Sequence, residues 1–261
     1  MTTSEIKANA REALKGKWGK AALITLVYGI ISYIISLVLG FIPVIGSLVS
    51  LVITLPISFG LIAVFMKFKR GEEVGYVDFF TLGFQSFGKV WGVFGNVILK
   101  MIVPVILVVI SVIILAFGMG ASISSSMMDA YSTGTISSAS VGFSGLAIVG
   151  LLLYFAAIIY AVIKGLYYVL VYNILFDNPN MTGKEIVEES ERLMAGNRWS
   201  YVWLYITFIG WSILAVFTLG IGYFWLMPYM TFAVICFYEN LSGKSSTATT
   251  TAESEPVKTE E

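Results

Sequence analysis

Two lysines are the side chains best placed to do chemistry in this sequence. Lys100 and Lys164 are the only charges embedded in long apolar stretches. An ammonium group in such a position either lines a basic cavity that holds an anion, such as a lipid head group, or extends along its own alkyl chain to the nearest polar surface. The second interpretation is favoured, because long side chains near the ends of membrane helices do this routinely. The first is kept as the alternative.

The other reactive groups lack the partners that catalysis needs. The chain has no His and a single Cys, so a hydroxyl nucleophile has no identifiable base. Four glutamates lie within 185–191, flanked by Lys184 and Arg192. This mixture of signs on one segment is typical of a solvated helix face and not of an acid–base pair or a metal site. We therefore expect no enzymatic activity, no cofactor and no bound metal.

The composition is that of an integral membrane protein. Hydrophobic residues make up 57% of the chain and charged residues 12%, which is too little polar surface to coat a soluble globule. The lipid bilayer is thus the expected partner. The formal net charge is zero, so nucleic acid is not an expected partner. Cys236 lies in an apolar run and is expected to be a small buried hydrophobic residue.

Six apolar runs approach the length of about 20 residues that a helix needs to cross a bilayer. Their backbone must be helical, because unpaired amides in lipid are too costly. We therefore predict an all-α fold, a polytopic transmembrane helical bundle with six spans. The predicted spans are 21–39, 47–66, 97–117, 146–163, 201–219 and 222–238.

The basic residues predict the orientation of the chain. Three connections between the runs, 40–46, 118–145 and 219–222, contain no Lys or Arg, whereas the other connections and both termini are basic. Basic residues concentrate in cytoplasmic segments. Both termini are therefore predicted to be cytoplasmic, and the three uncharged connections to face the other side.

This topology divides the chain into parts. Residues 1–20 are predicted to form a cytoplasmic amphipathic helix, and 21–241 the membrane domain. Within that domain, 118–145 is rich in Ser and Gly and is predicted to be a mobile extracytoplasmic loop. The tail, 242–261, has a similar composition and is predicted to be disordered.

Amphipathic segments precede the first, third and fifth runs and predict about three interfacial helices. Trp favours the membrane interface, so the tryptophans that end these segments, with the basic residues beside them, are candidate anchors. The third segment also contains Thr182 and Glu185 at the spacing of a capping box. The pattern suggests three degenerate units of one interfacial helix and two spans. The anchors are Lys17, Trp18, Trp91, Arg198 and Trp199.

The fourth run is longer than one crossing. From 146 to 176 it must tilt, bend near Gly165 or continue along the membrane surface. The sequence Asp177-Asn178-Pro179 then favours the end of a helix. We interpret Asp177 as a helix terminator, with a cytoplasmic ligand or a partner of Lys164 as the alternatives.

Three stretches of the sequence resemble one protein family. They are 10–19 (AREALKGKWG), 176–179 (FDNP) and 220–229, which contains GIG and WLMPY. The chain resembles, from about Ser4 to about Gly243, the integral membrane family catalogued as domain of unknown function 975. The resemblance implies a six-span protein of a bacterial cytoplasmic (plasma) membrane, and it supplies no catalytic residues.

Two hypotheses for function follow. The first is a membrane-organising or accessory protein whose basic and amphipathic segments bind anionic lipid or a protein partner. The second is a transport or lipid-handling protein in which Lys100 and Lys164 line an inward-facing basic cavity. Small residues at Gly29, Ser32 and Ser36 would permit close helix contacts within one chain or in a homo-oligomer.

Overall fold

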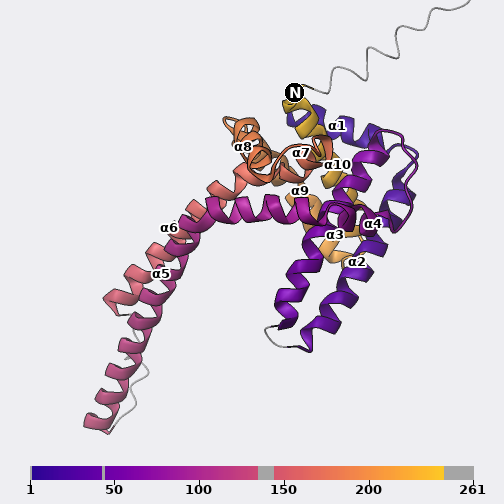
Figure 1. Ribbon diagram of the computed structural model, residues 1–261. Coiled ribbons are helices and arrows are strands. Elements are labelled where there is room, and N and C mark those ends of the chain that lie inside the picture. The colour runs from indigo at the N-terminus through magenta and orange to yellow at the C-terminus, as the bar shows by residue number, and fades with distance from the viewer. Residues whose placement is uncertain (1, 43–44, 135–143, 244–261) are drawn as a thin grey trace, which may run out of the picture. The chain divides into compact units, whose positions relative to one another are not determined.

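The computed structural model describes residues 2–42, 45–134 and 144–243, and every regular element in these ranges is a helix (Figure 1). Each apolar run lies in a long helix. Five helical segments are long and apolar enough to cross a membrane, which supports the membrane class. They are Trp18–Gly40, Ile45–Lys69, Phe87–Ser132, Gly145–Asp177 and Arg198–Phe217. The run at 222–238 lies in α10 (Tyr223–Leu241), which is not among these five.

The order of the helices follows the predicted pattern of one short helix before two long ones. The first set is α1 (Thr3–Leu14), α2 (Trp18–Gly40) and α3 (Ile45–Lys69), and the second is α4 (Asp78–Gln85), α5 (Phe87–Thr133) and α6 (Gly145–Gly165). A 3₁₀ turn at Leu166–Tyr168 and α7 (Val171–Asp177) come next. The third set is α8 (Gly183–Met194), α9 (Arg198–Phe217) and α10. The α-helix of the fourth run therefore ends at Gly165 and gives way to a 3₁₀ turn, at the position of one of the three predicted alternatives.

The chain differs from prediction after Gly118. α5 continues to Thr133, so residues 118–133 are helical where the composition predicted a loop. The serines there donate to carbonyl oxygens of the preceding turn, as Ser122 Oγ does to Gly118 O at 3.0 Å and Ser125 Oγ to Ser122 O at 2.9 Å, so their hydroxyls are compatible with the helix. Hydroxyls satisfied in this way need no water. The rest of the predicted loop, 135–143, and the predicted disordered tail from residue 244 lie outside the described residues.

The chain forms two compact units, residues 1–94 with 169–261 and residues 95–168. The second unit is a hairpin of α5 and α6. Its helices touch through glycines: a Cβ on Gly150 would lie 2.6 Å from the Leu115 backbone nitrogen, and one on Gly118 would overlap the backbone of Ala147. Ser144 caps α6 and also donates to Gly118 O at 2.7 Å. Glycine seams of this kind let membrane helices pack closely.

In the first unit, α3 is the central helix. Its Gly60 lies against the Phe79 carbonyl of α4, so close that a Cβ would overlap that oxygen. α3 also contacts α10. Its Phe65 and Phe68 pack edge-on against Phe232 of that helix, with ring centroids 5.7 and 6.4 Å away. These contacts bury α4 and α10 against one helix.

α1 and α8 are built alike within this unit. Each has 12 residues and starts with a complete capping box, Thr2 with Glu5 and Thr182 with Glu185. The second box confirms the prediction, and the first was not predicted although it has the same Thr-x-x-Glu spacing. Each helix is followed, at the same distance from its cap, by a glycine with positive φ, Gly16 (75°) and Gly196 (82°), a conformation that favours glycine.

Candidate functional site

The basic segment before α2 meets the basic end of α3. Lys17 Nζ donates to the Phe68 carbonyl at 3.4 Å, and the ammonium groups of Lys17 and Lys20 lie 5.3 and 5.6 Å from the centre of the Phe68 ring. The carbonyl end of a helix attracts cations, and so does an aromatic face. Both lysines thus stabilise the end of α3 at which Lys67, Lys69 and Arg70 also lie.

Asp177 joins two further segments to this end. It is the last residue of α7, as predicted, but its carboxylate also accepts hydrogen bonds from Arg70 Nη2 at 2.5 Å and from the Tyr238 hydroxyl at 3.1 Å. Its side chain is 1% exposed. The structure therefore pairs Asp177 with Arg70, a partner that the sequence does not predict. Lys69 forms an ion pair with Glu239 near the end of α10.

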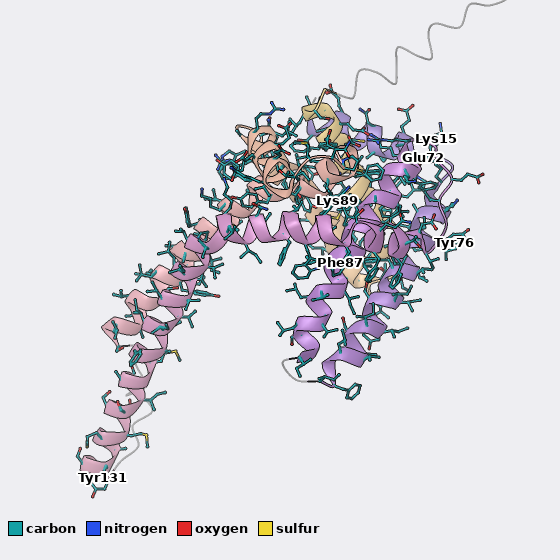
Figure 2. The ribbon with its side chains drawn as sticks, in the orientation of Figure 1. Lys15, Glu72, Tyr76, Phe87, Lys89 and Tyr131 are labelled. Carbon is teal, nitrogen blue, oxygen red and sulfur yellow. The ribbon has the colours of Figure 1, made fainter. Side chains whose placement is uncertain are left out.

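These contacts collect four stretches of sequence at one end of the first unit. The residues before α2, those after α3, those after α7 and the end of α10 are the stretches that the charge pattern assigns to the cytoplasmic side. Figure 2 shows Lys15 and Glu72, labelled in the first unit near this end. We call this region, defined by Lys15, Lys17, Lys20, Lys69 and Arg70, the basic end.

A pocket of about 500 Å³ lies between α1, α9 and α10, all in the first unit. α1 contributes Lys7 and Arg11, together with Ser4. α9 and α10 contribute apolar side chains, among them Trp211, Leu214, Trp225 and Leu226. The pocket is therefore amphipathic, with cations on one wall and large apolar side chains on the others.

The wall between α1 and α10 is held by Tyr229. Its hydroxyl donates to the Lys7 carbonyl at 3.4 Å. Its ring packs edge-on against Trp18, with centroids 5.9 Å apart, and against Phe208, with centroids 5.0 Å apart. Tyr229 of α10 therefore contacts three other helices around the pocket, because Lys7 belongs to α1, Trp18 begins α2 and Phe208 belongs to α9.

Lys7 and Arg11 are not among the site residues that the sequence predicts. Ser4, Lys7 and Arg11 are spaced by three and four residues, so they share one side of α1. The buried residues of that helix, Ile6, Ala10 and Leu14, have the same spacing. This spacing predicts a polar stripe along α1. It does not predict the pocket, because the other walls come from α9 and α10, some 200 positions away in the chain.

Lys100 and Lys164 lie in the second unit. Lys100 is exposed on α5, and Lys164 is half-buried near the end of α6, with its Nζ 6.0 Å from the centre of the Tyr167 ring. A cavity of about 200 Å³ between α5 and α6 is lined by other residues, including Ser111 and Tyr160. Contact of the two lysines with an anion stays a prediction.

The candidate anchors have different surroundings. Trp18 is half-buried against Tyr229, while Trp199, beside Arg198 at the start of α9, is 75% exposed. Trp91 lies within α5 and packs edge-on against Phe94 at 5.5 Å. Within the described ranges, its buried indole Nε1 has no hydrogen-bond partner. A role for these residues at the membrane interface stays a prediction.

The glutamates of α8 are engaged locally. Hydrogen bonds from the Thr182 backbone and hydroxyl lower the pKa of Glu185, and hydrogen bonds from Arg192 lower the pKa of Glu189. Lys184 and Glu188 form an i, i+4 ion pair at 3.8 Å. Over the part of the chain that the structure describes, no three His, Cys, Asp or Glu side chains are grouped so that they could hold a metal ion.

Comparison with known proteins gives one match. A family model described as "Protein of unknown function (DUF975)" matches residues 1–245. No curated protein and no solved structure matches the chain.

Proposed function

The chain belongs to the family of unknown function DUF975, and on that premise we propose that it is a non-enzymatic accessory protein of the bacterial cytoplasmic membrane that binds anionic lipid at its cytoplasmic face. The family description assigns no activity, so the proposal rests on geometry. Its central element is the basic end of the first unit.

The observation that carries the proposal is the meeting of separate basic segments at that end. Lys17 and Lys20 lie against Phe68, which Lys69 and Arg70 follow directly in the chain. Glu239 and Asp177 compensate the charges of Lys69 and Arg70, so the positive charge presented to lipid at this end is that of Lys15, Lys17 and Lys20. The cytoplasmic leaflet is rich in anionic lipid, which attracts each nearby Lys or Arg by about 1 kcal/mol. The concentration of cations at one end therefore supports a cytoplasmic position for that end and anionic lipid as its ligand.

We further propose that all six long helices cross the membrane. α10 has 19 residues, which corresponds to about 28 Å at 1.5 Å per residue. That is close to the hydrocarbon thickness of about 30 Å. α10 is less apolar than the others, but most of its second half is buried against neighbouring helices, including Phe232, Cys236 and Phe237. A helix that faces protein does not have to be as apolar as one that faces lipid. Six crossings also place both termini on one side.

The test measures which lipids the full-length protein retains. The protein is purified in neutral detergent containing equal amounts of phosphatidylglycerol and phosphatidylcholine, and the bound lipid is quantified by mass spectrometry. We expect selective retention of phosphatidylglycerol. The variant Lys15→Gln/Lys20→Gln is expected to reduce that selectivity by about fivefold per charge removed. Lys17 is left in place because it caps α3.

The matched control removes two positive charges elsewhere, in Lys184→Gln/Lys244→Gln. This variant is expected to keep the selectivity for phosphatidylglycerol. In the unmodified protein, the selectivity is expected to decline as salt is added, because salt screens exposed charges. Equal retention of the two lipids by the unmodified protein would overturn the proposal.

A further inference from the structure

We propose that the pocket between α1, α9 and α10 is a binding site for one phospholipid. Its phosphate would lie between Lys7 and Arg11, and an acyl chain would lie along Trp211, Leu214 and Trp225. The inference rests on the proposed function in one respect, since it needs a membrane-embedded chain with access to anionic lipid. It adds a defined site, distinct from the basic end.

The first argument is charge. Among the described residues, Lys67, Lys69 and Arg70 each have a carboxylate within ion-pair distance, and Arg192 is paired as well. No such partner in the described ranges lies beside Lys7 or Arg11. Two cations that line a pocket without a carboxylate favour an anionic occupant.

The second argument is that the fold does not require these cations. α8 has the same length, capping box and following glycine as α1. Counted from the capping threonines, the positions of Lys7 and Arg11 correspond to Val187 and Glu191 in α8. The same local structure therefore forms with an apolar and an acidic residue there, so the basic pair serves something other than the helix.

The third argument is the shape and chemistry of the pocket. Its volume of about 500 Å³ is within the range of about 300–1,000 Å³ for small-molecule sites, which is room for a phosphate head group and part of one acyl chain, with the rest of the lipid outside the pocket. A free phosphate would leave the apolar walls, which include two tryptophans, without an occupant. A plain hydrocarbon chain would leave the cations unpaired. A phospholipid satisfies both, with a polar head and an apolar chain on the matching walls.

The fourth argument is preorganisation. Tyr229 ties α1 to α10 through the Lys7 carbonyl, and its ring is held between Trp18 and Phe208. The walls are thus set before a ligand arrives, which lowers the entropic cost of binding.

The experiment titrates full-length protein in neutral detergent with phosphatidylglycerol whose acyl chains carry bromine, a quencher of indole fluorescence on contact. The pocket signal is the quenching that the unmodified protein shows in excess of the variant Trp211→Phe/Trp225→Phe, and we expect this difference to saturate at one lipid per chain. Trp211→Phe/Trp225→Phe is expected to remove most of the saturable signal. Lys7→Gln/Arg11→Gln is expected to raise the concentration for half-quenching by about 25-fold, about fivefold per charge. Leu214→Phe narrows the pocket without changing its charge and is expected to weaken binding as well.

The control Lys15→Gln/Lys20→Gln separates this site from the basic end. It is expected to leave the half-quenching concentration within about twofold of the unmodified protein, because neither residue lines the pocket. If Lys7→Gln/Arg11→Gln has no effect while Lys15→Gln/Lys20→Gln abolishes lipid selectivity, the pocket proposal fails and the proposed function stands. Equal quenching by brominated phosphatidylcholine, or displacement of the lipid by inorganic phosphate, would also overturn the lipid site.

Discussion

Arg70 and Asp177 are 107 residues apart in the chain, and the guanidinium Nη2 of one donates to the carboxylate Oδ1 of the other at 2.5 Å. The two ends of this contact differ in solvent exposure, since the Arg70 side chain is 38% exposed and that of Asp177 is 1% exposed. The contact fixes the end of α3 to the end of α7, and Tyr238 extends it to α10. It is the point at which three separate parts of the sequence become one surface.

Asp177→Asn is expected to destabilise the first unit by about 2 kcal/mol. This lies between the value for an exposed pair and that for a buried pair that loses one partner, because Arg70 is partly solvated. The measurement is the free energy of unfolding in detergent by chemical denaturation. Arg192→Gln, which breaks the exposed pair with Glu189 on α8, is the control and should cost under about 1 kcal/mol. Equal losses of stability in the two variants would show that the contact between Asp177 and Arg70 does not hold α3 and α7 together.

Gly60→Ala is expected to separate α3 from α4, because the added Cβ would overlap the Phe79 carbonyl oxygen, which is backbone and cannot turn aside. We expect a loss of stability of several kcal/mol or failure to accumulate in the membrane. Gly210→Ala, in α9, meets nothing within 4 Å and is expected to be neutral or slightly stabilising. Thermal unfolding of the two purified variants tests the difference, and a tolerated Gly60→Ala would refute the close contact.

Acid is expected to loosen α8 through its capping box. The pKa of Glu185 is lowered, chiefly by the hydrogen bond from the Thr182 backbone. A carboxyl with a lowered pKa contributes stability that is complete above its unfolded pKa, about 4.3, and is lost as the pH falls from there through the folded value. Hydrogen exchange over 183–194, corrected for intrinsic rates, should therefore accelerate in that window. Glu185→Gln keeps a capping side chain that does not titrate, so a variant with the same pH dependence would count against the box as its source.

Lys100→Ala and Lys164→Ala are expected to leave the binding of brominated phosphatidylglycerol unchanged. Neither residue lines the pocket between α1, α9 and α10, and both belong to the second unit. The readout is the same quenching titration, with Lys7→Gln/Arg11→Gln as the positive comparison. If Lys100→Ala alone loses binding, Lys100 contacts the lipid, and the transport hypothesis, in which Lys100 lines a basic cavity, is favoured instead.

Local features of the fold could be predicted from the sequence because local chemistry determines them. The apolar runs predicted the long helices, and the excess length after Leu146 predicted a tilt, a bend near Gly165 or a surface extension, of which the structure shows a break in the α-helix after Gly165. The Thr182 and Glu185 spacing predicted a capping box that the structure contains. Each of these depends on residues within a few turns of one another.

Features that depend on neighbours could not be predicted in this way. Composition predicted a loop from Gly118, yet α5 continues to Thr133, with its serine hydroxyls donating to carbonyl oxygens of the preceding turn, as Ser122 does to Gly118. The pairing of Asp177 with Arg70 and the pocket beside Lys7 are contacts between distant segments. Neither spacing nor periodicity encodes which helices pack together.

Cysteine accessibility in intact bacterial cells tests the central claim, the cytoplasmic position of the basic end, most directly. Single cysteines are placed at Lys15 and Glu72, near the basic end, and at Phe41 and Leu219, the latter 95% exposed in the turn between α9 and α10. The native Cys236 is buried and is replaced by Ser in all four variants. A maleimide that cannot cross membranes is predicted to label positions 41 and 219 in intact cells, and positions 15 and 72 only after the membrane is opened. Labelling of positions 15 and 72 from outside intact cells would contradict the account.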